Sequence, residues 1–362
     1  MVVDAHLITN DESFRELEPE WNGLLAESDH STPFMSWAWA STWWKYFGTG
    51  LLHVLTLRRN GKLIAIAPLH RVRGPWGMNS LQMLGTGQSD YLDFLVTKSE
   101  AIPCYSELLR HLLAEGGIDL ILLEQVPPDR LDVIKEIGQA AGAFLQIKER
   151  GHCYVVRLPS KWEDYLTGLG KNERYNIGRR TRALERQHGV VFRRFHQPGP
   201  ELEKRVEEFF NLMTKRLTMR GRRLAADEET SLRFHQALAA RFAERGWMNL
   251  GLLEREGRMI AGLFAFEYDR RLFYYHSGFD PDWAKFSTGM VLLAKCIEDA
   301  IGRGLREFDF MRGRAEYKSK WKVEEQPFYR AAVMRDSVRY LKFLGSGLAS
   351  RAGKLLKRTT AG

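Results

Sequence analysis

The sequence is poor in the features that mark secreted, metal-binding and membrane-spanning proteins. Its three cysteines, Cys104, Cys153 and Cys296, are far apart among the 362 residues. They give neither a disulfide framework nor zinc-ligand spacing, so we expect no metal and a buried apolar role for each thiol. No apolar run approaches the about 20 residues that span a bilayer, and the N-terminus lacks a basic start followed by an apolar stretch. A cytoplasmic protein is the simplest expectation.

Positive charge is concentrated in two segments. The net charge is +9, and residues 171–194 carry eight Lys or Arg against Glu173 and Glu185, while the last 28 residues carry seven against Asp336. Charge this localised indicates contact with phosphates or an acidic surface; the alternative is a solvated helix face and a frayed tail. Because Leu355 and Leu356 lie among its cations, the tail also fits weak peripheral contact with the inner membrane.

One pattern occurs twice. Residues 54–70 and 251–267 each read as two alternating apolar strands joined by a tight turn, Asn60-Gly61 in the first and Glu256-Gly257 in the second. Each copy continues with an apolar-faced helix, a glycine stop and a strand, at residues 105–124 and 292–311. Convergent patterning is the alternative to duplication. We expect an α/β protein with mixed sheets: a first domain at 1–150, a second at 151–335 and a basic tail at 336–362.

The first domain offers aromatic and acidic candidates. Trp39 belongs to a tryptophan-rich stretch that favours core packing, with the wall of a sugar-binding cleft as the alternative. Asp90 and Asp93 flank Tyr91 at the start of a strand, where paired carboxylates bind a substrate hydroxyl or amine, or satisfy turn amides. We take these four residues as substrate-binding candidates.

The second domain begins with a basic helix that ends at Gly189. Arg179, Arg182 and Arg186 share one face by their i, i+3, i+7 spacing, so Arg179 is a further substrate-binding candidate. The same face, with the region 215–223, would bind RNA if the substrate were an aminoacyl-tRNA.

The second copy alone carries Ser287-Thr288-Gly289 before its helix. Ser287 or Thr288 can cap the helix, and Gly289 lets another group approach the first turn. Free amides at the positive end of a helix suit a phosphate. A plain helix start is the alternative.

Polar residues then cluster around one strand. His276 ends a strand, and Asp309 lies on the strand face opposite Phe308 and Phe310, which is unusual without a partner. His276 and Asp309 are candidate bases, and Tyr317 could return a proton to a leaving group. Arg312 and Lys318 could hold phosphates; an internally paired charge cluster is the alternative reading.

The string from Tyr274 to Trp321 resembles the acetyltransferase domain of CelD-like and FemAB-like proteins in the GNAT superfamily. The matching pieces are Gly278-Phe279-Asp280, Ser287-x-Gly289, Gly304-Leu-Arg-Glu-Phe-Asp309-Phe, Arg312-Gly313 and Tyr317-Lys318-x-x-Trp321. The stretches around Trp39, Asp90 and Tyr175 are also similar to that family, so the resemblance extends over residues 10–330.

The resemblance implies two tandem GNAT-like domains, each a mixed, mostly antiparallel sheet flanked by helices, the first degenerate and binding the acceptor. It implies N-acyl transfer, from acyl-coenzyme A such as acetyl-CoA in GNAT enzymes or from aminoacyl-tRNA in FemAB-like ones. CelD-like members imply a sugar or sugar-nucleotide acceptor in polysaccharide or cell-envelope biosynthesis. The chain lacks the full Arg/Gln-x-x-Gly-x-Gly/Ala loop, so the donor stays open between the two. A non-catalytic glycan-binding or membrane-docking accessory protein is the third alternative.

Overall fold

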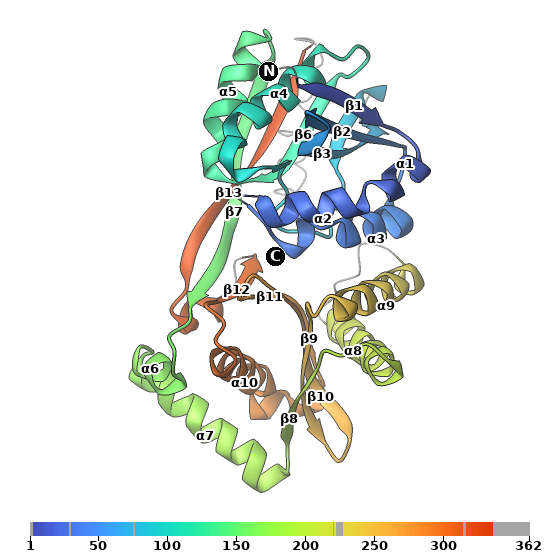
Figure 1. Cartoon of the computed structure of the whole chain (residues 1–362). Helices are drawn as coiled ribbons and strands as arrows, with labels where there is room; N and C mark the ends of the chain where they lie inside the picture. Colours follow the sequence, from blue (N-terminus) through green and yellow to red (C-terminus); the bar gives the residue numbers. More distant parts are fainter. Residues whose placement is uncertain are drawn as a thin grey trace, which may run out of the picture. The chain divides into compact units, whose positions relative to one another are not determined.

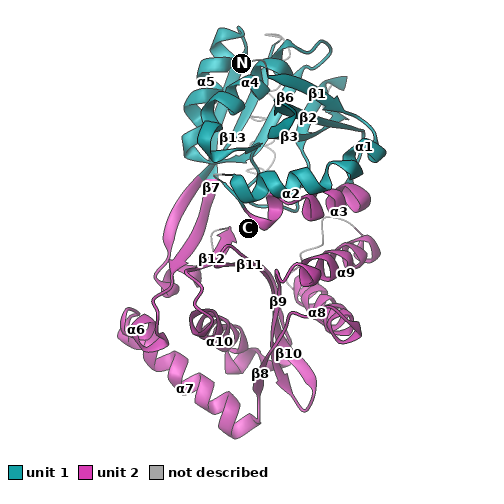
Figure 2. Cartoon of the chain, viewed as in Figure 1, with its two compact units in different colours: residues 1–31, 48–150, 328–362 teal, residues 32–47, 151–327 magenta. Residues whose placement is uncertain are grey.

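The computed structural model describes residues 3–28, 30–74, 77–219, 221, 227–313 and 316–335, so the expected basic tail at 336–362 lies outside the described residues. The chain forms two compact units (Figure 2). The first comprises residues 1–31, 48–150 and 328–362, and the second 32–47 and 151–327.

The units are not contiguous in sequence, unlike the expected division into 1–150 and 151–335. A break does fall between residues 150 and 151, but residues 32–47 belong to the second unit. The reason is aromatic packing: the ring of Trp39 lies 5.7 Å from that of Phe234 and 6.2 Å from that of Phe242. Burying these rings ties an N-terminal helix to the second unit.

The first unit is one sheet with helices packed on it (Figure 1). Its helices are α1 (Asp11–Glu16), α2 (Glu18–Glu27), α4 (Ala101–Ala114) and α5 (Leu131–Ala140), with the 3₁₀ turns η3 (Lys98–Glu100) and η4 (Pro128–Arg130). Its strands are β1 (Asp4–Ile8), β2 (Leu51–Arg59), β3 (Lys62–Arg73), β4 (Asn79–Met83), β5 (Leu95–Val96), β6 (Leu120–Val126) and part of β13 (Glu324–Met334). The strand order is β1-β2-β3-β4-β6-β13, and β5 pairs with β3.

The second unit has the same kind of architecture. Its helices are α3 (Trp37–Phe47), α6 (Trp162–Thr167), α7 (Lys171–His188), α8 (Pro200–Met219), α9 (Glu228–Glu244) and α10 (Thr288–Gly302), with the turns η1 (Pro33–Met35), η5 (Pro281–Phe286) and η6 (Lys318–Trp321). Its strands are part of β7 (Phe144–Arg157), then β8 (Val191–Phe195), β9 (Met248–Arg255), β10 (Arg258–Tyr268), β11 (Arg271–Phe279) and β12 (Glu307–Arg312). The strand order is β7-β12-β11-β10-β9-β8.

The duplication read from the sequence is confirmed. The predicted hairpins are β2–β3 and β9–β10, and both central residues of each turn have positive φ: 51° and 78° at Asn60-Gly61, 51° and 76° at Glu256-Gly257. Turns of this hand match the twist of the strands they join. Each hairpin is followed by a strand, a helix and a parallel strand: β4–α4–β6 in one unit and β11–α10–β12 in the other. The expected mixed, mostly antiparallel sheets flanked by helices are therefore present twice.

Candidate functional site

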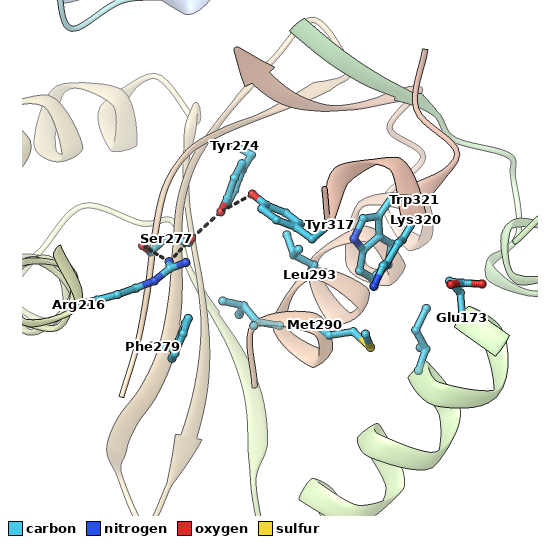
Figure 3. A pocket seen from close by; sticks show the side chains of 14 residues that line it. Glu173, Arg216, Tyr274, Ser277, Phe279, Met290, Leu293, Tyr317, Lys320 and Trp321 are labelled. Atoms are coloured by element: carbon cyan, nitrogen blue, oxygen red, sulfur yellow. Dashed lines mark hydrogen bonds between the residues drawn. The ribbon is translucent and has the colours of Figure 1, made fainter. Parts of the chain in front are cut away.

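A pocket of about 220 Å³ opens in the second unit beside the start of α10 (Figure 3). It is lined by Glu173, Ile177, Arg216, Tyr274, Ser277, Gly278, Phe279, Gly289, Met290, Leu292, Leu293, Tyr317, Lys320 and Trp321. Its wall is mostly apolar with a few polar groups, which is the usual composition of a small-molecule site.

The pocket exists because two neighbouring strands separate. β11 and β12 pair in parallel only from Arg271–Phe273 to Glu307–Asp309. Beyond that point Met311 adopts a left-handed φ of 60°, which turns the end of β12. Main-chain pairing therefore stops, and side chains of β11, α10 and η6 face the space that opens.

A β-bulge decides which side chains of β11 face the pocket. The register with β10 shifts between Phe264, opposite His276, and Ala265, opposite Tyr274, so Tyr275 is the extra residue. Tyr274 and Ser277 line the pocket. Tyr275 packs instead against Trp39, with ring centroids 5.5 Å apart.

Four side chains form one hydrogen-bonded chain along the pocket wall (Figure 3). The hydroxyl of Tyr317 lies 3.4 Å from that of Tyr274, and the hydroxyl of Tyr274 lies 2.5 Å from Oγ of Ser277. Arg216, from α8, donates through one guanidinium nitrogen to Ser277, at 3.2 Å to Oγ and 3.1 Å to the carbonyl oxygen. This chain joins a phenol in the pocket to a fixed positive charge.

The start of α10 borders the same pocket. Gly289 lines it, and a Cβ placed there would meet only Phe279, at 3.8 Å. The expected side-chain cap is wrong: Ser287 has a left-handed φ of 58° and makes no capping hydrogen bond, and Thr288 is fully buried. The carbonyl of Ser287 instead accepts from the amides of Met290 and Val291. The helix end is open at Gly289, where an anionic or narrow group fits.

Lys318 does not hold a phosphate in this structure. Its side chain is buried, and Nζ donates to the carbonyl oxygens of Phe310, Met311 and Arg312 at 2.9, 3.1 and 3.0 Å. An ammonium group has three hydrogens. The predicted phosphate contact is therefore corrected to a structural one that fixes the turned end of β12.

Asp309 and Arg312 also lie outside the residues that line the pocket. Asp309 is fully buried, accepts from the amide of Met311 at 2.7 Å and lies 3.4 Å from a guanidinium nitrogen of Arg271. Its partners fit the internally paired alternative. Arg312 is exposed and registers with Cys153 of β7.

His276 faces away from the pocket because of the bulge. Its ring lies 5.3 Å from that of His235, which belongs to α9. Burial, with smaller contributions from His235 and Arg312, lowers the pKa of His276 to about 3. A group with this pKa accepts a proton poorly near neutrality, so the arrangement favours Tyr317 over His276 for proton transfer.

The acidic candidates of the first unit are buried. Asp93 accepts from Nε of Arg130 at 3.1 Å and from the amide of Phe94 at 2.8 Å. Burial raises the pKa of Asp93, and the charge of Arg130 opposes that rise. Asp90 is buried as well, and Tyr91 is half-buried with a left-handed φ of 58°. The partners of Asp93 fit a structural role rather than the predicted substrate contact.

Two further candidates have clear positions. Trp39 has no exposed surface, so the core reading holds and the cleft-wall alternative is wrong. Arg179 is exposed on α7 with Arg174, Arg182 and Arg186. Within the described residues none of these four cations has an acidic partner; Arg179 contacts only Asn176 and the ring of Tyr175.

Sequence reasoning missed Arg216, Tyr274 and Ser277. Arg216 was one of several cations in a basic region, and only tertiary packing brings it to β11. The sequence of β11 gave no sign of the bulge, so it did not show that Tyr275 and His276 both face away from the pocket.

The described residues offer neither a metal centre nor a membrane-crossing helix. In that part of the chain, no group of three or more His, Cys, Asp and Glu side chains could hold a metal ion. No helix within the same ranges has the length and apolar character to cross a membrane.

A family model matches most of the second unit. Residues 171–319 match the family model described as "Acetyltransferase (GNAT) domain". This range holds most of the pocket lining, including Arg216, Gly289 and Tyr317. No curated protein sequence matches the chain.

Solved structures share the fold over most of the chain. FemX matches with a TM-score of 0.62 and 12% identity, covering 90% of this chain and 96% of FemX. L-PGS from Bacillus licheniformis matches with a TM-score of 0.56 and 11% identity, covering 92% of this chain and 96% of that one. The chain therefore shares the fold of these structures, and residues 171–319 of its second unit are similar to a GNAT acetyltransferase domain.

Proposed function

We propose that this chain, a GNAT-superfamily acyltransferase with two GNAT-like units, transfers an acyl group from acyl-coenzyme A to an amine in the pocket of the second unit. The observation that carries the proposal is the convergence of Gly289 and Tyr317 on one pocket. A helix end open to a carrier phosphate and a phenol able to move a proton are the two parts that such a reaction needs.

The residues present fit the carrier. The space beside Gly289 accepts a narrow group, and Phe279, Met290 and Leu293 give that part of the wall an apolar surface. Coenzyme A supplies a thioester when bound, so the leaving group is a thiol. Amides at the start of α10 would hold its phosphates; Lys318 would not, because its donors are in use.

Tyr317 is the proposed proton-transfer residue. Its phenol gives a proton to the leaving sulfur, and its oxygen takes one from the nitrogen that forms the new amide bond. The net reaction moves the amine proton to the thiol, so atoms and charge balance. A positioned acid–base group of this kind contributes about 100- to 10,000-fold in rate.

The acceptor is proposed to be an amine on a sugar or sugar-nucleotide, in polysaccharide or cell-envelope biosynthesis. The resemblance to CelD-like proteins supports this choice. A thermal-shift screen of acyl-coenzyme A species against nucleotide sugars tests donor and acceptor together, since a ligand that binds the folded state raises the melting temperature.

The role of Tyr317 is tested by Tyr317→Phe, with Tyr46→Phe as the matched loss of a phenol oxygen outside the pocket. We expect free-thiol release with an amine acceptor to fall at least 100-fold in the first variant and to stay unchanged in the second. Full activity of Tyr317→Phe removes the assigned proton role, and failure of every acyl-coenzyme A to bind removes the proposed donor.

The exposed cations of α7 favour a second candidate, transfer from an aminoacyl-tRNA. Arg174, Arg179, Arg182 and Arg186 have no acidic partners within the described residues, as expected of a surface that binds a polyanion. Changing Arg179, Arg182 and Arg186 together to Glu should lower RNA affinity and reduce the logarithmic salt dependence by about 3. Acyl-coenzyme A binding should persist in this variant under the first candidate.

A further inference from the structure

We propose that Arg216 is a positioning residue: through Ser277 and Tyr274 it holds the phenol of Tyr317 and stabilises the negative charge left there when its proton moves. This inference rests on the acyl-transfer function proposed above. It assigns work to three residues that no sequence motif marks.

Close packing of α8 on β11 brings Arg216 to the pocket. A Cβ on Gly278 would lie 3.0 Å from the amide nitrogen and 3.1 Å from Cα of Met213, so only glycine allows this approach. Arg216 follows Met213 by one helical turn and therefore projects from the same side of α8. Its guanidinium then lies 4.4 Å from the ring centroid of Phe279, which holds the charge over the pocket wall.

The guanidinium group of Arg216 determines the direction of the hydrogen bonds from Arg216 to Tyr274. Arginine only donates hydrogen bonds and does not release its proton in proteins, so Oγ of Ser277 is the acceptor from Arg216. Ser277 can then donate to Tyr274. The hydroxyl of Tyr317 donates to that of Tyr274 in the resting protein, and once this proton has left, the hydroxyl of Tyr274 turns to donate to the phenolate oxygen. No proton can leave past Arg216. The chain therefore stabilises an anion at its far end rather than conducting protons to solvent.

The two lysines near Tyr317 are not placed to stabilise its phenolate. Lys318 is bound to three carbonyl oxygens, and Lys320, which also lines the pocket, is exposed to solvent. Charge in water is screened far more than charge against protein. Among the cations that the structure describes at the pocket, Arg216, half-buried and joined to the hydrogen-bonded chain, is the one best placed to act on the phenolate oxygen.

The step balances without any co-reactant. The O–H bond of Tyr317 breaks as its proton goes to the leaving sulfur, and the negative charge stays on the phenolate oxygen. Tyr274 donates to that oxygen, Ser277 donates to Tyr274, and Arg216 donates to Ser277. The phenolate then takes the proton lost by the amine nitrogen, which restores the starting state.

The test combines a spectroscopic and a kinetic measurement on the full chain. The variants are Arg216→Gln, Arg216→Lys and Ser277→Ala, with Lys204→Gln as the matched loss of an exposed cation on α8. 3-Fluorotyrosine incorporated at position 317 reports its surroundings by ¹⁹F NMR without substrate. Acyl transfer from acetyl-coenzyme A to an amine acceptor found in the binding screen gives kcat and KM.

We expect the fluorine resonance to move in Arg216→Gln and Ser277→Ala and not in Lys204→Gln. We expect kcat to fall about 10- to 100-fold in Arg216→Gln, with KM for acetyl-coenzyme A changed less than about twofold and partial recovery in Arg216→Lys. A merely structural residue would lower the melting temperature without this split between kcat and KM.

Two results overturn the inference. A fluorine resonance that ignores both Arg216 and Ser277 shows that no chain reaches the phenol. A resonance that moves while kcat does not shows that the chain has no part in catalysis. Absence of acyl transfer in the unmodified protein defeats the proposed function instead, and the fluorine result still reports the coupling.

Discussion

Both units contain the same strand–helix–strand crossover, with β4–α4–β6 in the first and β11–α10–β12 in the second. The pocket that the described residues line lies in the second unit. In the first unit β4 and β6 pair in parallel from Ser80–Gln82 to Leu120–Leu122, and in the second β11 and β12 pair over an equally short stretch. Each final strand then reaches a residue with left-handed φ: Gln125 at 62° and Met311 at 60°. The same backbone device opens both pairs of strands.

The space beyond each opening is used differently in the two units. In the first unit the side chain of Gln125 donates to the carbonyl of Ser89 at 2.6 Å, and Arg130 pairs with Asp93, so the segment after β4 fills the space. In the second unit half-buried and exposed polar side chains form the hydrogen-bonded chain from Arg216 to Tyr317 along the pocket wall. One scaffold thus uses an internal arginine for stability and the other leaves its arginine beside a ligand-sized space.

The largest expected effect is on the filled unit. Arg130→Met leaves Asp93 buried without its cation, and breaking one side of a buried pair costs about 3–5 kcal/mol. Urea unfolding should show this loss, while Arg110→Met, which breaks an exposed pair with Glu107, should cost less than about 1 kcal/mol. Acyl-coenzyme A should still stabilise whatever folded Arg130→Met remains. If Arg130→Met instead lost ligand binding and kept full stability, Arg130 would act in binding and not in stabilising the first unit.

Local chemistry explains which parts of this comparison the sequence predicted. Asn60-Gly61 and the stop at Gly189 need residues that tolerate left-handed φ, so the hairpins and the end of α7 could be read directly. Pairings across long sequence separations could not be read. Asp93 finds Arg130 at 37 residues' distance, and Arg216 finds Ser277 at 61. Both depend on packing that no local pattern encodes.

The candidate site shows the same limit. Gly289 and Tyr317 were candidates from the sequence, and both line the pocket. Gly289 lies at the start of a helix that the pattern located, whereas Tyr317 precedes the turn η6, which the pattern did not show. Lys318 was misassigned, since the turned end of β12 exposes three carbonyl oxygens, and no sequence pattern marks that turn. His276 was misjudged because a one-residue bulge reverses the face on which it lies.

Acid stability should separate the units next. Buried His70 of the first unit contacts the carbonyl oxygen of Thr49. His235 of the second unit contacts the carbonyl oxygen of Ser231 and also packs against the ring of His276. Burial lowers the pKa of His235 to about 4, and burial with His235 and Arg312 lowers that of His276 to about 3.

Proton linkage gives the direction in which stability changes with pH. Unfolded histidine has a pKa of about 6.5, so the unfolded state binds more protons below that pH. The stability that these two histidines contribute is present above about pH 6.5 and falls as the pH drops toward about 4. The free energy of unfolding, measured with urea, should differ between about pH 7 and about pH 4. His235→Phe should reduce this difference by up to about 3 kcal/mol. An unchanged slope would place the acid sensitivity elsewhere.

The second residue of the crossover helix differs between the units and can be exchanged by mutation. The second residue of α10 is Gly289, and the second residue of α4 is Ile102, which is 45% exposed. Gly289→Ile copies the first unit and fills the space beside Phe279, so acyl-coenzyme A affinity should fall at least tenfold, about 1.4 kcal/mol. Stability should change by no more than about 1 kcal/mol, because the position faces a cavity. Ile102→Gly should leave the affinity unchanged, and full affinity in Gly289→Ile would move the carrier away from α10.

The smallest difference between the units lies in their hairpin turns. Asn60 and Glu256 hold the same place with the same φ of 51°, but asparagine adopts left-handed backbone far more readily than glutamate. Glu256 makes a weak ion pair with Arg255 at 3.4 Å, and its side chain is 82% exposed, so little is lost on its replacement. Glu256→Asn should therefore stabilise the second unit by about 0.5 kcal/mol, part of the ~1–2 kcal/mol cost of a left-handed residue. Asn60→Glu should destabilise the first by a similar amount. Because both turns lie outside the pocket, acyl-transfer rates should not change in either variant. Changes of opposite sign in the free energy of unfolding, measured with urea, would show that the two hairpins are interchangeable. With equal rates in both variants, the difference in function between the units would begin after the hairpins.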